Sequence, residues 1–303
     1  MIKIVYMGTP HYAKEILQTL LDDNKIEIPL VITQPDRKAG RKNKLKAPDV
    51  KILAEEYNLN ILQPEKLSEE GIYEAIVDAK PDFIVVAAFG QLLPKSILDI
   101  APCINLHASL LPAYRGASPV QQSLLNDDKF TGVTAMLMEE GLDSGPILGY
   151  RYLKIPQDMI LPELMNRLSS DACSLTTDII HRFDTIEPME QNRAVATHCK
   201  KIKKADGLVN LCDVQTLYSK YRSYAGWPGI FLEGGIKISD IKLLDKNPNE
   251  MNGTILALLE TTIVLSGCNG SIEIGTIQVP SKKAVTAKSY CLGKGLKVGD
   301  SLF

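Results

Sequence analysis

The stretch Ile2-Lys-Ile-Val-Tyr-Met-Gly-Thr-Pro-His-Tyr-Ala-Lys-Glu-Ile-Leu-Gln-Thr-Leu-Leu21 joins a short apolar run to a helical repeat. Residues 2–7 predict a buried strand, because β-branched and apolar side chains fill the run up to a Gly-Thr-Pro turn. Apolar residues then recur at positions 13, 16, 17, 20 and 21, which is the spacing of one helix face. We expect Thr9 to cap this helix and Pro10 to be its first helical residue. The stretch therefore predicts a strand–turn–helix unit.

The first half of the chain repeats this unit. Further strands are predicted at residues 29–33, 60–62, 83–88 and 103–106, with helices at 49–57 and 69–78 between them. Residues 133–137 and 147–155 predict a hairpin on the same sheet, and a long helix over 162–183 follows. Such alternation is typical of an α/β, Rossmann-like domain with a mostly parallel sheet. The first turn lacks the second and third glycines of a dinucleotide-binding loop, so a nicotinamide dinucleotide is not expected.

The second half has a different pattern. The chain of 303 residues is long enough for one large and one small domain. A polar segment ends in the basic run 200–204, then one helix is predicted over 214–225, and short β-like runs between glycines fill residues 229–279. We therefore expect a catalytic domain over 1–188, a basic linker over 189–206, and a small C-terminal β-barrel over 207–303, of which the OB type is one candidate.

Composition excludes several classes of protein. With 45% hydrophobic residues, 23% charged residues and a net charge of −2, any nucleic-acid contact must come from local basic clusters. The chain has no secretory signal and no apolar run of roughly 18 residues, so we expect a cytoplasmic protein without a membrane segment. The six cysteines are scattered without metal-ligand spacing, which predicts free thiols and no metal site.

Chemistry is indicated where the 103–106 strand ends. Asn105 and His107 are two residues apart, so on an extended segment their side chains leave on the same face. An amide and an imidazole on one face can both donate to a single oxyanion. Asp143, in the turn Gly141-Leu-Asp-Ser-Gly145, would reach His107 if the two strands are neighbours, and would orient the ring as an imidazolium. Each residue alone is more often structural; the combination indicates catalysis.

The run Asn105-Leu-His-Ala-Ser-Leu-Leu-Pro112 with a downstream Asp143 resembles the signature of the formyltransferases that use 10-formyltetrahydrofolate. The resemblance implies that Asn105 and His107 polarise the formyl oxygen, and that Asp143 sustains the imidazolium and helps to move protons, without a metal. It also implies a folate site formed by the following residues: Phe89, Gly90, Leu92, Ser109, Leu110, Leu111 and Pro112.

The acceptor is indicated by a second segment, Thr33-Gln-Pro-Asp-Arg-Lys-Ala-Gly-Arg-Lys-Asn-Lys-Leu-Lys-Ala-Pro48, with six basic and no acidic residues between positions 37 and 46. A solvated charged loop is the simplest interpretation. However, a loop after a parallel strand lies on the same rim as the active site, where basic side chains can hold phosphates. The segment resembles the loop of superfamily members that formylate methionyl initiator tRNA, which implies tRNA contacts by Arg37, Arg41, Lys42 and Lys44.

Two alternatives remain open on the sequence. A sugar-nucleotide formyltransferase would share the catalytic residues but has no need of the basic segment. A pure RNA-binding protein would leave Asn105, His107 and Asp143 unexplained. The resemblance to the tRNA-modifying members extends over the whole chain, strongly up to residue 155, and nothing in the sequence demands more than a monomer.

Overall fold

The computed structural model describes residues 1–39, 44–244 and 251–302. Its residues form two compact units that interleave along the chain. The first unit contains Met1–Pro119, Phe130–Ile155 and Leu164–Lys200, and the second contains Val120–Lys129, Pro156–Glu163 and Lys201–Phe303. Two short segments of the first half thus belong to the second unit. There, the Ser223 hydroxyl donates to the Gln121 carbonyl at 2.8 Å and the Tyr218 hydroxyl donates to Asp158 at 2.8 Å.

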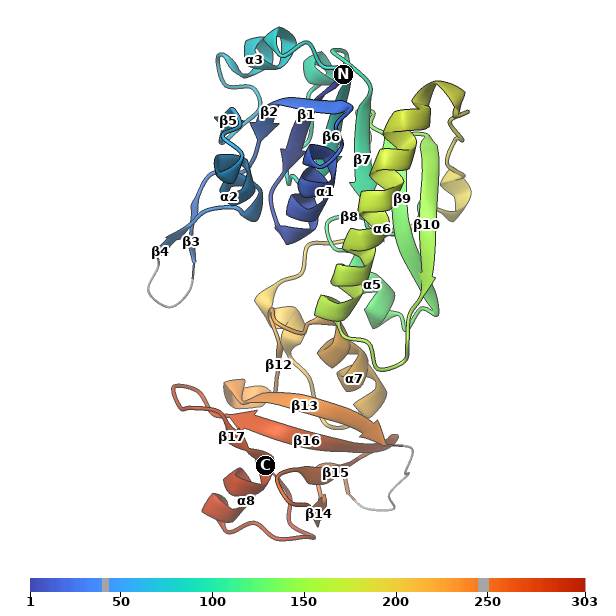
Figure 1. Ribbon diagram of the computed structural model, residues 1–303. Coiled ribbons are helices and arrows are strands. Elements are labelled where there is room, and N and C mark those ends of the chain that lie inside the picture. The colour runs from blue at the N-terminus through green and yellow to red at the C-terminus, as the bar shows by residue number, and fades with distance from the viewer. Residues whose placement is uncertain (40–43, 245–250, 303) are drawn as a thin grey trace. The chain divides into compact units, whose positions relative to one another are not determined.

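A seven-stranded sheet forms the centre of the first unit, in the order β10-β9-β7-β6-β1-β2-β5 (Figure 1). The five parallel strands are β1 (Ile2–Gly8), β2 (Ile26–Ile32), β5 (Ile61–Leu62), β6 (Phe83–Ala87) and β7 (Cys103–His107). The hairpin of β9 (Phe130–Leu137) and β10 (Ile147–Lys154) extends the sheet with antiparallel pairing to β7. The predicted mostly parallel, Rossmann-like sheet is confirmed.

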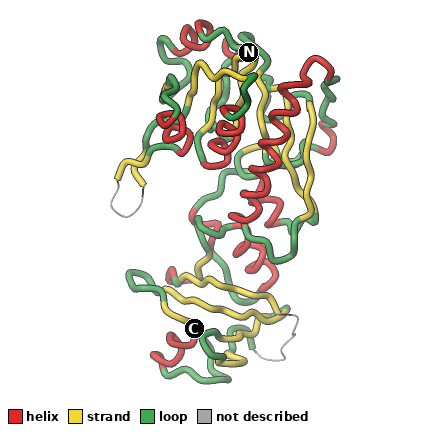
Figure 2. The backbone as a smooth tube through the Cα atoms, in the orientation of Figure 1, coloured by secondary structure: helices red, strands yellow, loops and turns green. Residues whose placement is uncertain are grey.

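Helices cover both faces of this sheet (Figure 2). On one face Val5 and Met7 of β1 join a buried cluster with residues of α3 and α4, and on the other the Tyr6 hydroxyl donates to the Ala13 carbonyl of α1 at 2.5 Å. Because both faces are buried, the central strands are continuous apolar runs. The helices of the first half are α1 (His11–Leu21), α2 (Asp49–Glu56), α3 (Ile72–Asp78), α4 (Lys95–Leu98), α5 (Pro119–Leu125) and α6 (Leu161–Arg182).

The predicted start of α1 was wrong by one residue. Pro10 is the N-cap, the helix begins at His11, and no side chain caps it. Thr9 does not cap the helix, because its hydroxyl donates to the main-chain oxygen of Phe89 at 3.2 Å. A hydrogen bond to the distant loop at Phe89 thus takes the place of the predicted capping bond to the helix.

The second unit is built on an antiparallel sheet in the order β12-β13-β16-β15-β14, with β17 paired to β16. Its helix α7 (Val214–Ser223) shares an apolar core with these strands and with α8 (Ala287–Lys294), which the sequence did not predict. The predicted β-rich C-terminal fold is confirmed as an antiparallel sheet domain. Its strands are β12 (Ile230–Phe231), β13 (Lys237–Leu244), β14 (Ile255–Leu258), β15 (Ile263–Gly267), β16 (Gly270–Gln278) and β17 (Val285–Thr286).

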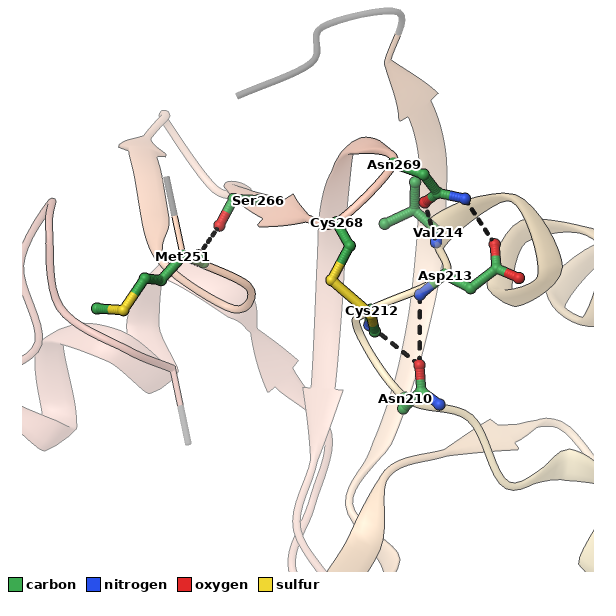
Figure 3. Close-up of a disulfide and its surroundings, with 8 residues drawn as sticks. All are labelled: Asn210, Cys212, Asp213, Val214, Met251, Ser266, Cys268 and Asn269. Carbon is green, nitrogen blue, oxygen red and sulfur yellow. Dashed lines mark hydrogen bonds between the residues drawn. A yellow bond between two sulfur atoms is a disulfide. The ribbon is translucent and has the colours of Figure 1, made fainter. Parts of the chain in front are cut away.

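Two cysteines contradict the expectation of six free thiols. Cys212 and Cys268 form a disulfide just before α7 (Figure 3). The Cys268 N–H donates to the Cys212 carbonyl at 2.8 Å and the two Cα atoms are 4.9 Å apart, so tertiary folding brings together residues that are 56 positions apart. Asn269 continues the contact, because its amide donates to Asp213 at 2.9 Å. The free cysteines are Cys103, Cys173, Cys199 and Cys291.

Short elements complete the description. A small hairpin of β3 (Arg37–Ala39) and β4 (Lys44–Lys46) follows β2 and projects from the sheet (Figure 1). β8 (Arg115–Gly116) pairs in parallel with β11 (His198–Cys199), so part of the predicted linker forms sheet structure in the first unit. The 3₁₀ helices are η1 (Phe183–Thr185), η2 (Arg193–Val195), η3 (Lys204–Gly207) and η4 (Glu233–Gly235). Over the described residues, no helix is both long and apolar enough to span a membrane.

Candidate active site

β7 carries the two polar side chains that the sequence singled out. Asn105 and His107 lie on one face of the strand and are 9% and 6% exposed. β9 lies beside them, with Asn105 opposite Met136 and His107 opposite Thr134. Because β9 leads into the loop that contains Asp143, this pairing brings the carboxylate back to β7. The predicted neighbourhood of the two strands is therefore present in the sheet.

Asp143 is held against β7 by two hydrogen bonds to its carboxylate. The Gly116 N–H donates to Oδ2 at 2.7 Å and the Asn105 amide donates to Oδ1 at 3.3 Å. His107 Nδ1 lies 3.7 Å from Oδ2, and the side chains of His107 and Asp143 are 7% and 12% exposed. The structure thus brings Asn105, His107 and Asp143 together, with a main-chain N–H of Gly116 as a fourth participant that the sequence did not assign.

A hydrogen bond of the His107 Nε2 atom fixes the orientation of the ring. Nε2 lies 2.9 Å from the main-chain oxygen of Tyr114. A carbonyl oxygen only accepts, so Nε2 carries the hydrogen in this bond. Nδ1 is then the nitrogen that faces Asp143.

The turn after β7 is held by a hydroxyl that the sequence analysis overlooked. Thr134, fully buried on β9, donates to the Ser109 carbonyl at 2.6 Å and accepts from the Leu111 N–H at 3.0 Å. The Ser109 hydroxyl closes the turn by donating to the Ala113 carbonyl at 2.6 Å. Leu111 is buried with Met136 beneath the turn, whereas Leu110 and Pro112 are half-buried. This rigid turn contains four of the seven predicted folate residues.

The other three predicted folate residues follow β6 and lie in different environments. The Phe89 side chain is 2% exposed in the apolar core, whereas Leu92 is 70% exposed. Gly90 has a φ of 87°, a conformation that favours glycine. Gln91 anchors this loop, because its side chain accepts from the Leu67 N–H at 3.1 Å and donates to the Pro64 carbonyl at 3.2 Å.

Arg115 and Gln191 form a buried hydrogen-bonded pair that contacts the main chain of Asp143, and neither residue was predicted. Both are buried, at 6% and 7% exposure. The Arg115 guanidinium donates to Gln191 Oε1, and the Gln191 amide donates to the main-chain oxygen of Asp143 at 3.0 Å. Arg115 lies three residues after the Asn105–Pro112 run, and its closeness to that run is the one sequence signal for it. Gln191 lies in the predicted linker, where no sequence pattern distinguishes it.

The basic hairpin holds two of the four predicted tRNA residues, Arg37 and Lys44, and both are exposed. Arg41 and Lys42 lie outside the described residues. The base of the hairpin is fixed by Asp36, which accepts from Gln63 at 2.9 Å and from Lys51 at 3.0 Å. The hydrogen bond from Gln63, and then that from Lys51, lower the pKa of the Asp36 carboxyl. The hairpin therefore leaves the sheet in a defined direction.

Two further observations concern other kinds of site. Among the residues that the structure describes, no group of three or more His, Cys, Asp or Glu side chains is arranged to hold a metal ion. A cavity of about 550 Å³ lies in the second unit, lined by residues that include Leu211, Leu217 and Lys220. Its lining contains none of the predicted site residues.

The chain matches two family models. Residues 2–180 match the formyl transferase family, and residues 201–295 match the formyl transferase C-terminal domain. The candidate catalytic residues Asn105, His107 and Asp143 all fall within the first match.

Solved structures show the same fold at low sequence identity. An N-formyltransferase from Helicobacter canadensis, solved with folinic acid and dTDP-3-aminofucose, aligns with a TM-score of 0.67 at 17% identity, covering 92% of this chain and 100% of that one. HypX from Aquifex aeolicus, solved with tetrahydrofolic acid, aligns with a TM-score of 0.62 at 14% identity, covering 97% of this chain and 48% of that one.

Curated relatives are much closer in sequence. The methionyl-tRNA formyltransferase of a Sulfurovum species is 55% identical over 300 residues, which cover 99% of both chains. Those of a Nitratiruptor species and of Campylobacter lari are 48% and 47% identical, and each alignment covers 100% of both chains. With identities of 47–55% over essentially the full length of both chains, the chain belongs to the methionyl-tRNA formyltransferase family.

Proposed function

We propose that this chain acts as a cytoplasmic monomer that transfers the formyl group of 10-formyltetrahydrofolate to the free amino group of methionyl initiator tRNA. The observation that carries this proposal is the Asp143 carboxylate, which is held by the Gly116 N–H and the Asn105 amide beside His107. An amide, an imidazole and a carboxylate in one buried cluster are the groups that acyl transfer to an amine requires.

The chemistry assigns a task to each group. The unprotonated amine attacks the formyl carbon, and the formyl oxygen becomes an oxyanion. The Asn105 amide has two N–H groups, of which one donates to Asp143, so the other can donate to this oxygen. Loss of one such donor typically costs about 3 kcal/mol in the transition state.

His107 and Asp143 handle the proton. Because Nε2 donates to Tyr114, Nδ1 exchanges a proton with the reacting groups, and Asp143 stabilises the ring while it is charged. Collapse of the tetrahedral intermediate breaks the bond between the formyl carbon and the folate nitrogen; that nitrogen gains a proton as tetrahydrofolate leaves, and the amine nitrogen loses one. We place the folate against the Ser109–Pro112 turn, because its main chain is held rigid by Thr134 and its leucines supply apolar surface.

The acceptor is assigned from the basic hairpin. Arg37 and Lys44 are exposed on β3 and β4, where they can contact phosphates, and we assign Arg41 and Lys42 the same role. The C-terminal unit, within residues 207–303, would add contacts to the tRNA, with the basic residues 200–204 between the two regions. A sugar-nucleotide acceptor would not explain the basic side chains of the hairpin.

The test is a formylation assay with 10-formyltetrahydrofolate and charged methionyl-tRNA, initiator and elongator, beside an amino-sugar nucleotide. We expect transfer to the initiator, and we expect His107→Ala and Asp143→Ala each to lower turnover by a factor of about 10² to 10³ with the fold intact. No transfer to the initiator would contradict the acceptor. Turnover near that of the unmutated chain in either variant would contradict the catalytic assignment.

A further inference from the structure

We infer that Gln191 and Arg115 are positioning residues that set the place of the Asp143 carboxylate, an inference that rests on the proposed function. Gln191 lies near the end of the first unit and reaches back to the loop between β9 and β10. No sequence motif includes it, and its amide nitrogen donates to main-chain oxygens, which are not marked by any residue type.

The Gln191 side chain uses its full hydrogen-bonding capacity. Its Oε1 accepts from Arg115 Nε at 3.0 Å and from Nη2 at 2.7 Å. Its Nε2 donates to the carbonyl of Asp143 at 3.0 Å and to that of Gly145 at 2.8 Å. Oε1 accepts from two N–H groups and Nε2 donates to two carbonyls, so exchanging the oxygen and nitrogen of the amide would break all four hydrogen bonds. Arg115 therefore fixes the direction in which Gln191 donates.

The loop that Gln191 holds has little other freedom. Asp143 has a φ of 47°, in the left-handed region that non-glycine residues rarely adopt. Gly145 packs so tightly that a Cβ there would lie 2.0 Å from the Leu137 carbonyl oxygen. The two hydrogen bonds from Gln191 to the carbonyls of Asp143 and Gly145 therefore fix the main chain from which the Asp143 side chain extends. The carboxylate can then meet the Gly116 N–H and the Asn105 amide at once.

Arg115 ties this support to the other side of the site. Its neighbour Gly116 supplies the N–H that binds Asp143 Oδ2, and both residues form β8. One dipeptide therefore contacts Asp143 twice, directly through a main-chain N–H and indirectly through the Arg115–Gln191 pair. Burying a guanidinium and an amide is costly, and the four bonds offset part of that cost, since they use both N–H groups of the Gln191 amide and two of the five N–H groups of Arg115.

The decisive variant is Gln191→Glu. A carboxylate keeps the size of the side chain and gives Arg115 an ion-pair partner, which preserves the fold, but it has no N–H to donate to the loop. We expect kcat in formylation to fall by a factor of about 10 to 100, because a small displacement of a catalytic group has an effect of that size. The KM values for both substrates should stay within about threefold, because no substrate contact is removed. Gln191→Met, which removes all four bonds, should lower kcat at least as much.

Deuterium exchange gives a readout that does not depend on activity. In Gln191→Glu, peptides over residues 138–149 should exchange faster than in the unmutated chain, while peptides of α1 (His11–Leu21) should not change. The control is Gln18→Ala, which removes an exposed amide that donates to Asp22 and Tyr57 at 2.8 Å, and it should leave kcat and the exchange of the 138–149 peptides unchanged.

The outcomes separate the hypotheses. A kcat within twofold of the unmutated chain, or unchanged exchange of the 138–149 loop, would overturn the inference. Faster exchange in α1 as well as in the loop would also overturn it, since Gln191 would then support the fold in general. If the unmutated chain does not formylate methionyl-tRNA, the proposed function fails, and the exchange data alone still decide whether Gln191 holds the loop.

Discussion

Gly116 is the position where one added methyl group should do the most damage. Its φ is 117°, and a Cβ there would lie 2.4 Å from the carbonyl oxygen of Cys199. That oxygen belongs to the main chain of β11, which is paired with β8, so it cannot rotate out of the way. The Gly116 N–H also donates to Asp143 at 2.7 Å. Gly116→Ala therefore perturbs packing and the active site together.

The size of the effect follows from these distances. An L-residue in the left-handed region costs about 1–2 kcal/mol, and forcing an extra carbon into a packed site costs about 1–3 kcal/mol more. We therefore expect the free energy of unfolding to fall by about 2–5 kcal/mol. To bring the contact from 2.4 Å to at least 3.0 Å, β8 must shift by roughly 0.6 Å, which lengthens the bond from Gly116 to Asp143. Since a displacement near 1 Å can cost about 100-fold in rate, kcat should fall by about 10- to 100-fold.

The assay compares urea unfolding and single-turnover formylation in Gly116→Ala and in a matched control, Gly71→Ala. Gly71 also has a positive φ, 84°, but a Cβ there would meet nothing within 4 Å. The control should lose only the conformational cost of about 1–2 kcal/mol and no activity. If both variants lose the same stability and Gly116→Ala keeps its kcat within twofold, the contact with Cys199 does not constrain the site and the reasoning is refuted.

Three further predictions concern other parts of the chain. Thr134→Val leaves the Leu111 N–H without its acceptor and the Ser109 carbonyl without its donor. The free energy of unfolding should therefore fall by about 2 kcal/mol, and the KM for the formyl donor should rise. An unchanged free energy in urea unfolding together with an unchanged KM in steady-state kinetics would contradict this. Asp36→Ala releases the base of the basic hairpin and should weaken methionyl-tRNA binding in a filter assay while kcat at saturation stays within about threefold; equal affinity would contradict it. Asp213 caps α7, and Asp213→Ala should cost about 1 kcal/mol at neutral pH. Hydrogen bonds from the Thr216 hydroxyl and then from the Thr216 N–H lower the pKa of Asp213 in the folded protein. The charged carboxylate therefore stabilises the folded state at pH values above its unfolded pKa of about 3.9. This contribution is lost as the pH falls through the lower pKa of the folded state. The stability difference between parent and variant should therefore shrink below about pH 4, and a constant difference down to about pH 2 would contradict the assignment.

Local patterns were sufficient for the strands of the seven-stranded sheet, but not for their order. Apolar runs and glycine turns are properties of neighbouring residues, so these strands were predicted to within a few residues, and β6 agrees with residues 83–87 of the predicted 83–88. The short strands β3, β4 and β8 were not predicted. The start of α1 was wrong because the Thr9 hydroxyl bonds to Phe89, which is 80 residues away. The disulfide of Cys212 and Cys268 was missed for the same reason, since only tertiary folding brings the two residues together.

The sequence by itself determined the α/β class and indicated the three candidate catalytic side chains. Asn105 and His107 share a face because a strand has a period of two, and Asp143 reaches them because β9 pairs with β7. Tertiary structure alone decided what holds them. The Gly116 N–H, the Thr134 hydroxyl and the Gln191 amide reach the site by hydrogen bonds to distant residues. Such bonds depend on where main-chain atoms lie in space, and residue types at a given spacing along the chain do not record those positions.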